Sequence, residues 1–188
     1  MRIPLLFIAA SVLGAGALSA ETQEFKADKA HSSVTFKIRH FFTKVPGSFA
    51  EMDATIKYNE ADPSKSSATA QIDVASVDTN NSDRDEHLAS DDFFSASSHP
   101  TMTFESTEWK VDGDNQFSVT GNLSMNGETK PVTLDVTLLG MQPNRDGAMV
   151  SGWEISGKLD RRDWGITYGQ GIVGNEVEFE ALLQAPQA

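Results

Sequence analysis

The sequence contains no cysteine among its 188 residues. A disulfide framework, a thiolate nucleophile, a cysteine-based zinc site and a lipid-modified cysteine are therefore excluded. Basic residues are also scarce, with 15 Lys and Arg against 27 Asp and Glu and a net charge of −12 with histidine neutral. This acidic excess argues against nucleic-acid binding, which needs a basic surface, and against attachment to anionic lipid by overall charge. It is typical of a protein kept soluble by its charge.

Long apolar runs are absent except at the N-terminus. Arg2 precedes a nearly continuous apolar stretch, and small residues follow it up to Ala20. This layout is typical of a cleaved secretory signal peptide, and the apolar stretch is too short for a membrane span. We expect residues 1–20 to be the signal peptide and residues 21–188 to be one domain, with cleavage after Ala17 or Ala20. The alternative is an uncleaved anchor. Arg2 is the only charged residue in the leader, so the mature chain would carry −13.

The rest of the chain shows the period-two alternation of apolar and polar residues that indicates strands with one face in a core. The alternating runs are residues 34–38, 52–58, 68–74, 102–109, 117–123, 132–138, 149–155 and 177–181. Turn signals separate them, and Asn126-Gly127 is the most specific because both central positions of a type I′ turn favour positive φ. Evenly spaced strands joined by turns predict an antiparallel sandwich or closed barrel.

One segment, residues 79–90, lacks this alternation. Asn81 or Ser82 could cap a short helix with Asp83 and Asp85 in its first turn. We expect this helix to cover the barrel or one of its openings.

Motifs in a fixed order resemble those of the YceI-like family. The opening is DKAHSSVTFKIRH at residues 28–40, and VPGSF follows at residues 45–49. The remaining matching segments are residues 77–79, 84–88, 92–94, 99–106, 121–132 and 160–165. The resemblance covers nearly all of the mature chain. Ser95 and Ser124 depart from the family's usual aspartate and threonine, which puts nothing important in doubt.

The resemblance implies an all-β fold, an extended antiparallel lipocalin-like β-barrel of about eight strands with one short helix. It also implies a long apolar tunnel that binds a polyisoprenoid, an isoprenoid quinone or a similar long-chain amphiphile, with no cofactor, no metal and no catalytic activity. Together with the leader it implies a periplasmic carrier or sequestering protein that does not span a membrane. A homodimer is expected from the resemblance alone.

Large apolar residues on the alternating runs are the candidates for the tunnel lining. An inward residue on such a strand is ordinarily core, so the group supports a lining only together with the resemblance. The candidates are Phe36, Ile38, Phe49, Met52, Ile56, Ile72, Phe93, Phe94, Met102, Phe104, Trp109 and Trp153.

Four residues are candidates for the tunnel mouth or a ligand head group. Phe41 and Phe42 stand between two predicted strands, where they could lie at the mouth, meet a membrane transiently or fold back onto the barrel. His40 or Arg84 could contact the head group.

Polar residues within the motifs allow two further interpretations. His31, His87 and an aspartate could form a metal site, or Asp85 and His87 an acid–base pair, in an enzyme acting on a lipid or quinone. Asp85 and His87 lie on different sides of a helix, and no His-x-x-x-His or Gly-x-Ser-x-Gly occurs. We therefore favour ion pairs and hydrogen bonds that hold the barrel and helix together. A structural protein whose lumen is filled by side chains is a third reading.

Overall fold

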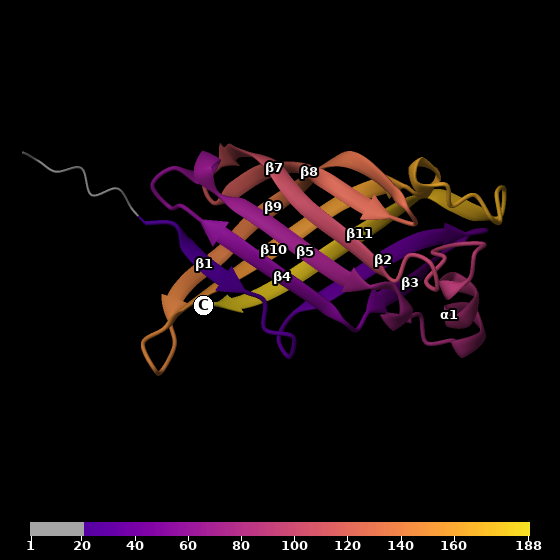
Figure 1. Ribbon diagram of the computed structural model, residues 1–188, viewed down its shortest axis with the longest axis horizontal. Helices are drawn as coiled ribbons and strands as arrows, with labels where there is room; N and C mark the ends of the chain where they lie inside the picture. The colour runs from indigo at the N-terminus through magenta and orange to yellow at the C-terminus, as the bar shows by residue number, and fades with distance from the viewer. Residues whose placement is uncertain (1–20) are drawn as a thin grey trace, which may run out of the picture.

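The computed structural model describes residues 21–188, so the predicted signal peptide lies outside the described residues. Within this range eleven strands form one antiparallel sheet that curls around a long axis (Figure 1). The strands are β1 (Gln23–Lys26), β2 (Ser33–His40), β3 (Thr43–Phe49), β4 (Met52–Tyr58), β5 (Ser67–Asp73), β6 (Val77–Asp78), β7 (Thr101–Gly113), β8 (Gln116–Met125), β9 (Glu128–Pro143), β10 (Met149–Asp160) and β11 (Val173–Pro186). The helices are α1 (Ser82–Ala89) and the 3-10 turns η1 (Pro63–Lys65), η2 (Val74–Ser76) and η3 (Arg161–Trp164).

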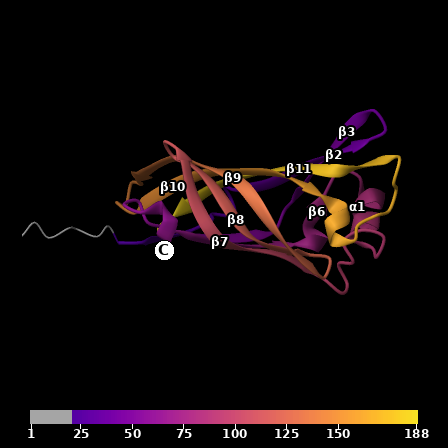
Figure 2. The same cartoon turned by 90° about the horizontal axis from the view of Figure 1, so that it is seen from above.

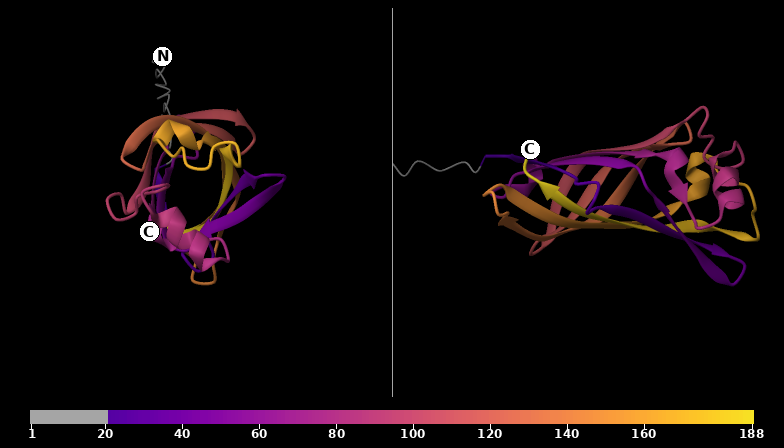
Figure 3. Two further views of the ribbon diagram at one scale, coloured as in Figure 1. Left: turned by 90° about the vertical axis from the view of Figure 1, so that its right-hand side faces the viewer. Right: turned by 90° about the horizontal axis from the view of Figure 1, so that it is seen from below.

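Neighbouring strands follow the order β1-β4-β5-β7-β8-β9-β10-β11-β2-β3-β6. The two short edge strands bring the edges of the sheet together. β1 pairs with β4, and its Phe25 also bridges to Gln187, the residue after β11. β6 follows η2 and pairs with the end of β3 through Phe49 and Val77. Seen end-on, the strands therefore encircle an interior, with α1 and η3 at one end and both the C-terminus and β1 at the other (Figures 2 and 3).

The predicted all-β antiparallel fold with one short helix is confirmed, but the strand number is eleven instead of about eight. The three additional strands are β1, β3 and β6. β1 has four residues and β6 has two, too few to show an alternation. In β3 the alternation is broken by Pro46-Gly47.

Local signals set the turn and the helix as expected. Asn126 and Gly127 have φ of 49° and 80° and connect β8 to β9. Asn81 is the N-cap of α1, and its side chain accepts a hydrogen bond from the Arg84 amide at 2.9 Å. In the described part of the chain, no helix has the length and apolar character needed to cross a bilayer.

Candidate ligand cavity

The inward side chains of the barrel leave a cavity of about 420 Å³. Successive residues of a strand point to opposite faces, so each strand contributes a row of side chains to the interior. The cavity falls within the range of about 300–1,000 Å³ that is typical of small-molecule sites. Its lining is apolar except for three threonines and a group of basic residues and one tyrosine at the α1 end.

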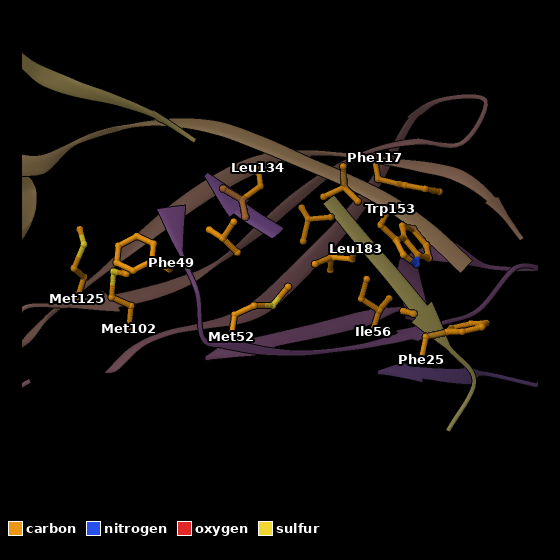
Figure 4. Packing of buried hydrophobic residues seen from close by; sticks show 14 of the residues in the cluster. Phe25, Phe49, Met52, Ile56, Met102, Phe117, Met125, Leu134, Trp153 and Leu183 are labelled. Carbon is orange, nitrogen blue, oxygen red and sulfur yellow. The ribbon is translucent and has the colours of Figure 1, made fainter. Parts of the chain in front are cut away.

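Eleven of the twelve side chains predicted to line the tunnel face this cavity. They are Phe36, Ile38, Phe49, Met52, Ile56, Ile72, Phe93, Phe94, Met102, Phe104 and Trp109. Figure 4 shows several of them, with the thioethers of Met52 and Met102 among the interior side chains. Their contact with a ligand stays a prediction.

Many further lining residues were missed by the sequence analysis. Some of them lie on β2 to β5, on α1 and after η3, and those on β8 to β11 include Val119, Leu123, Met125, Val132, Leu134, Val136, Ile155, Leu159, Val177, Phe179, Ala181 and Leu183. The alternation of residues 132–138 with threonine and aspartate was the signal that could have identified three of them.

Glycines opposite phenylalanines keep aromatic rings against the wall. Gly47 pairs with Phe36 across β2 and β3, and a Cβ on Gly47 would lie 2.3 Å from Phe36 Cζ. Gly157 pairs with Phe179 across β10 and β11, where a Cβ would lie 2.8 Å from Cε1. Each ring therefore occupies the place of the missing side chain, and less of it fills the lumen.

The end of the barrel near the C-terminus is filled by aromatic rings. Tyr58, Phe117 and Trp153 meet with centroid distances of 5.2–6.4 Å, and Trp109 packs 5.6 Å from Phe117. The Trp153 side chain is fully buried, and its Nε1 donates to Ser151 Oγ at 2.8 Å. Trp153, the twelfth residue predicted for the lining, does not border the cavity and belongs to this aromatic plug. Burial raises the pKa of the Tyr58 phenol.

The opposite end is bordered by α1, η3 and the loops beside them. His87 lies edge-on to Phe93 and Tyr168 at centroid distances of 5.1 and 4.9 Å. His87 Nε2 is 2.9 Å from Asp92 Oδ2. Phe94 packs edge-on to Phe49 at 6.0 Å. These contacts link the helix segment to the loop before β11 and form the mouth of the cavity.

All charged or readily titratable side chains lining the cavity are basic. They are His40, Arg84, His87 and Arg161, and no Asp or Glu of residues 21–188 joins them. The sequence contains 27 Asp and Glu, yet none of those in the described residues lines the cavity. Arg84 is itself held in place, because its Nε and Nη2 donate to Thr79 Oγ1 and Thr79 O at 2.6 and 2.7 Å.

Arg161 is the most buried of these cations, with 3% of the residue exposed. It donates to Gly174 O at 2.8 Å and to Ile166 O at 3.0 Å, and no carboxylate of the described residues pairs with it. The neighbouring Asp160 instead binds Arg162 through both carboxylate oxygens. Burial lowers the pKa of the Arg161 guanidinium, although a guanidinium remains charged in proteins. A cation without an ion-pair partner among the described residues thus faces the cavity.

The remaining candidates are placed as follows. Phe41 and Phe42 do not line the cavity but form the exposed tip of the β2–β3 hairpin. His31 pairs with Asp28 beside the first residues of β2, whereas His87 lies on α1, so they do not share a site. Asp85 accepts hydrogen bonds from Thr79 instead of facing His87. In residues 21–188 no three His, Asp or Glu side chains are grouped so that they could hold a metal.

Residues 25–185 match the family model of the YceI-like domain. A UPF0312 protein of Pectobacterium atrosepticum is 40% identical over 182 residues, which cover 95% of this chain and 94% of the relative. Protein YceI of Salmonella arizonae is 39% identical over 172 residues, or 90% of each chain.

Solved structures resemble the barrel as well. BcnA of Burkholderia cenocepacia is 27% identical with a TM-score of 0.77, over 84% of this chain and 98% of BcnA. The YCEI protein of Campylobacter jejuni is 31% identical with a TM-score of 0.70, over 86% of this chain and 96% of the relative. A polyisoprenoid binding domain from Saccharophagus degradans shares the fold at 13% identity, with a TM-score of 0.69 over 89% of this chain and all of that domain. The chain belongs to the YceI-like domain family.

Proposed function

We propose that this protein is a periplasmic lipid-binding protein and not an enzyme. It holds a polyisoprenoid, an isoprenoid quinone or a similar long-chain amphiphile in its lumen, as a carrier or for sequestration. The observation that carries this proposal is the apolar cavity of about 420 Å³ with basic residues at one end only. Apolar cavities stay dry and take up apolar ligands, so such a space favours a hydrocarbon tail.

Burial of the tail provides the affinity. Each methylene moved from water into the lumen contributes about 0.8 kcal/mol, and the loss of ligand entropy offsets part of that sum. Binding should therefore increase with chain length until the lumen is filled. Met52 and Met102 suit a lining that adapts to different chains, because their thioether side chains are flexible.

The orientation of the ligand follows from the two ends. The aromatic plug fills one end, so the tail points toward Trp109 and the head lies at the mouth near His40, Arg84 and Arg161. Basic residues in a lining that holds no carboxylate of the described residues favour a head that is anionic or a strong hydrogen-bond acceptor.

The polyisoprenoid binding domain with this fold is consistent with an isoprenoid cargo, although the likeness is one of fold. No cofactor is needed for binding and release. Transient contact of the mouth with a membrane belongs to the proposal, because a water-insoluble cargo must leave and re-enter lipid. A homodimer stays a prediction.

The proposal is tested by titrating delipidated protein with isoprenoid alcohols of increasing length, with native mass spectrometry as the readout. We expect one ligand per barrel and an affinity that rises with length to a plateau. An absence of binding, or an affinity independent of tail length, contradicts the proposal.

A further inference from the structure

The β2–β3 hairpin carries two exposed phenylalanines at its tip. Phe41 is 52% exposed and Phe42 is 99% exposed. Figure 2 shows this hairpin projecting away from the barrel at the end that also carries α1. Neither ring lines the cavity, so neither is explained by the proposed lumen.

The stability of the hairpin turn does not explain why Phe41 and Phe42 stand there either. Phe41 has φ of 49°, a left-handed conformation that is unfavourable for a bulky side chain. The same chain uses Asn126-Gly127 for another two-residue hairpin turn, which is the favoured chemistry. The Arg39 guanidinium donates to Phe41 O at 2.7 Å and helps to hold this strained turn.

Unpaired basic residues accompany the phenylalanines. Among residues 21–188, five Lys or Arg side chains form no ion pair, and Lys37 and Arg39 on β2 are two of them. Both alternate with the inward-facing Ile38 and therefore lie on the outer face of the hairpin. Lys44, opposite Arg39, pairs with Glu178 at 2.6 Å.

The exposed apolar surface continues to the mouth of the cavity. Phe41 N donates to Ile172 O at 2.9 Å, which ties the tip to the loop before β11. In that loop Ile172 is 42% exposed and Tyr168 is 48% exposed. We call Phe41, Phe42, Tyr168 and Ile172, together with Lys37 and Arg39, the docking tip.

We propose that the docking tip binds the interface of a bilayer containing anionic lipid, with the rings of Phe41 and Phe42 inserted among the head groups and upper acyl chains. Aromatic residues favour this interfacial region, and Lys37 and Arg39 are placed to meet anionic head groups behind them. Tyr168 belongs to both the docking tip and the cavity mouth, so docking would bring that mouth to the lipid. The purpose of docking rests on the proposed function, but docking itself can be measured on the empty protein.

The acidity of the whole chain does not oppose this orientation. Residues 37–44 contain three Lys or Arg and no Asp or Glu, although the chain as a whole carries −12. The hairpin arm from Lys37 to Phe41 spans roughly 13 Å at strand geometry. Charges are screened beyond about 8 Å at physiological ionic strength. Glu178, opposite Lys37 on β11, already pairs with Lys44. Acidic residues farther along the barrel are largely screened at the tip.

The test is flotation of the delipidated chain of residues 21–188, which contains every described element, with vesicles. One set contains phosphatidylethanolamine with phosphatidylglycerol, and the other contains phosphatidylcholine alone. The parent should float with the first set. F41S/F42S should bind more than about tenfold more weakly, the effect of removing two inserted rings. K37Q should weaken binding to anionic vesicles by about fivefold and leave binding to phosphatidylcholine unchanged.

The matched control is V111S/L139S, which removes two exposed aliphatic side chains outside the docking tip, 58% and 59% exposed. It should float as the parent does. Equal flotation of F41S/F42S and the parent, or an equal loss in the control, would overturn the proposal. Because Phe41 and Phe42 do not line the cavity, F41S/F42S should still bind isoprenoid alcohol, which also verifies its folding.

Sedimentation of the protein without lipid tests the alternative that the docking tip binds a second copy of this chain. A parent that dimerises, does not float and becomes monomeric in F41S/F42S would overturn bilayer docking in favour of self-association. Failure to float with intact isoprenoid binding would remove this inference and leave the proposed function standing.

Discussion

Arg161 is the residue whose role the structure changes most. The motif DRRDW at residues 160–164 places Arg161 beside Asp160 in the sequence, and this order alone favours an ion pair. In the structure Asp160 instead pairs with Arg162. Arg161 donates hydrogen bonds to backbone carbonyls on the wall of the cavity. Neighbours in a sequence cannot show which of two adjacent guanidinium groups turns inward, because that depends on the packing of η3 against β11.

We predict that R161Q weakens binding of geranylgeranyl phosphate by about 10- to 100-fold, the effect of losing a hydrogen-bonded charge contact. Binding of geranylgeraniol should change little, since its tail does not need the cation. The ratio of the two affinities, measured by titration, is the readout, because a loosened loop would lower both. R162Q is the control, as Arg162 does not line the cavity. An unchanged ratio in R161Q would contradict an anionic head at this position.

We predict that G47A crowds the Phe36 ring, which lies 2.3 Å from the new Cβ position, and drives it toward the lumen. Overpacking of this kind typically destabilises by about 1–3 kcal/mol. Chemical denaturation should show this loss, and titration should show weaker binding of long tails. G140A is the control, because nothing lies within 4 Å of its Cβ position. Similar stabilities of G47A and G140A would mean that Phe36 moves freely.

At the scale of elements, regular patterns were predictable and irregular ones were not. The runs that became β2, β4, β5 and β7 to β11 could be found because each is long enough to alternate. β1, β3 and β6 are short or interrupted, and they form through pairing with distant strands. Most lining residues follow from alternation, but an open lumen depends on cross-strand pairs such as Phe36 with Gly47. Register of this kind is not visible in a local pattern.

The 3-10 turn η3 is held by one carboxylate with a pH-dependent effect. Hydrogen bonds from Arg162 lower the pKa of Asp160 from 3.8 to about 2. A carboxyl whose pKa is lower in the folded state stabilises the fold above its unfolded pKa, and this contribution is lost as the pH falls through the folded pKa. The pair is partly exposed, so its effect is small.

We predict that D160N lowers the free energy of unfolding by about 0.5 kcal/mol at neutral pH, because Asn keeps the cap on the Arg162 amide but loses the charged pair with the Arg162 guanidinium. The difference from the parent should shrink between pH 4 and pH 2, because the parent's own carboxyl becomes protonated there. Denaturation at several pH values measures this. D163N, at an exposed position in the same turn, should match the parent. A difference that stays constant down to pH 2 would contradict a role of the charge.

At the scale of the molecule, the barrel separates three properties along its axis. Aromatic rings fill one end, an apolar space occupies the middle, and basic side chains border the mouth beside an exposed hairpin. This arrangement cannot be predicted from the overall composition. The chain has an excess of acidic residues, but the lining holds no carboxylate of the described residues.

We predict that A70W reduces binding of long tails by at least about tenfold, because Ala70 lines the cavity opposite Ala54 and Phe104. The indole would occupy space that the ligand needs. Q71W is the control, since Gln71 is exposed on the next position of β5. Both variants should fold, as judged by circular dichroism. Equal binding in A70W and Q71W would show that the ligand does not enter the lumen.

The most direct measurement is mass spectrometry of organic extracts from the protein purified without detergent from its own cells. The account predicts a long-chain amphiphile at about one copy per barrel in the parent, and much less in A70W. An extract without such a species, together with no uptake of added isoprenoid quinone by the delipidated protein, would contradict the central claim that the cavity holds a lipid.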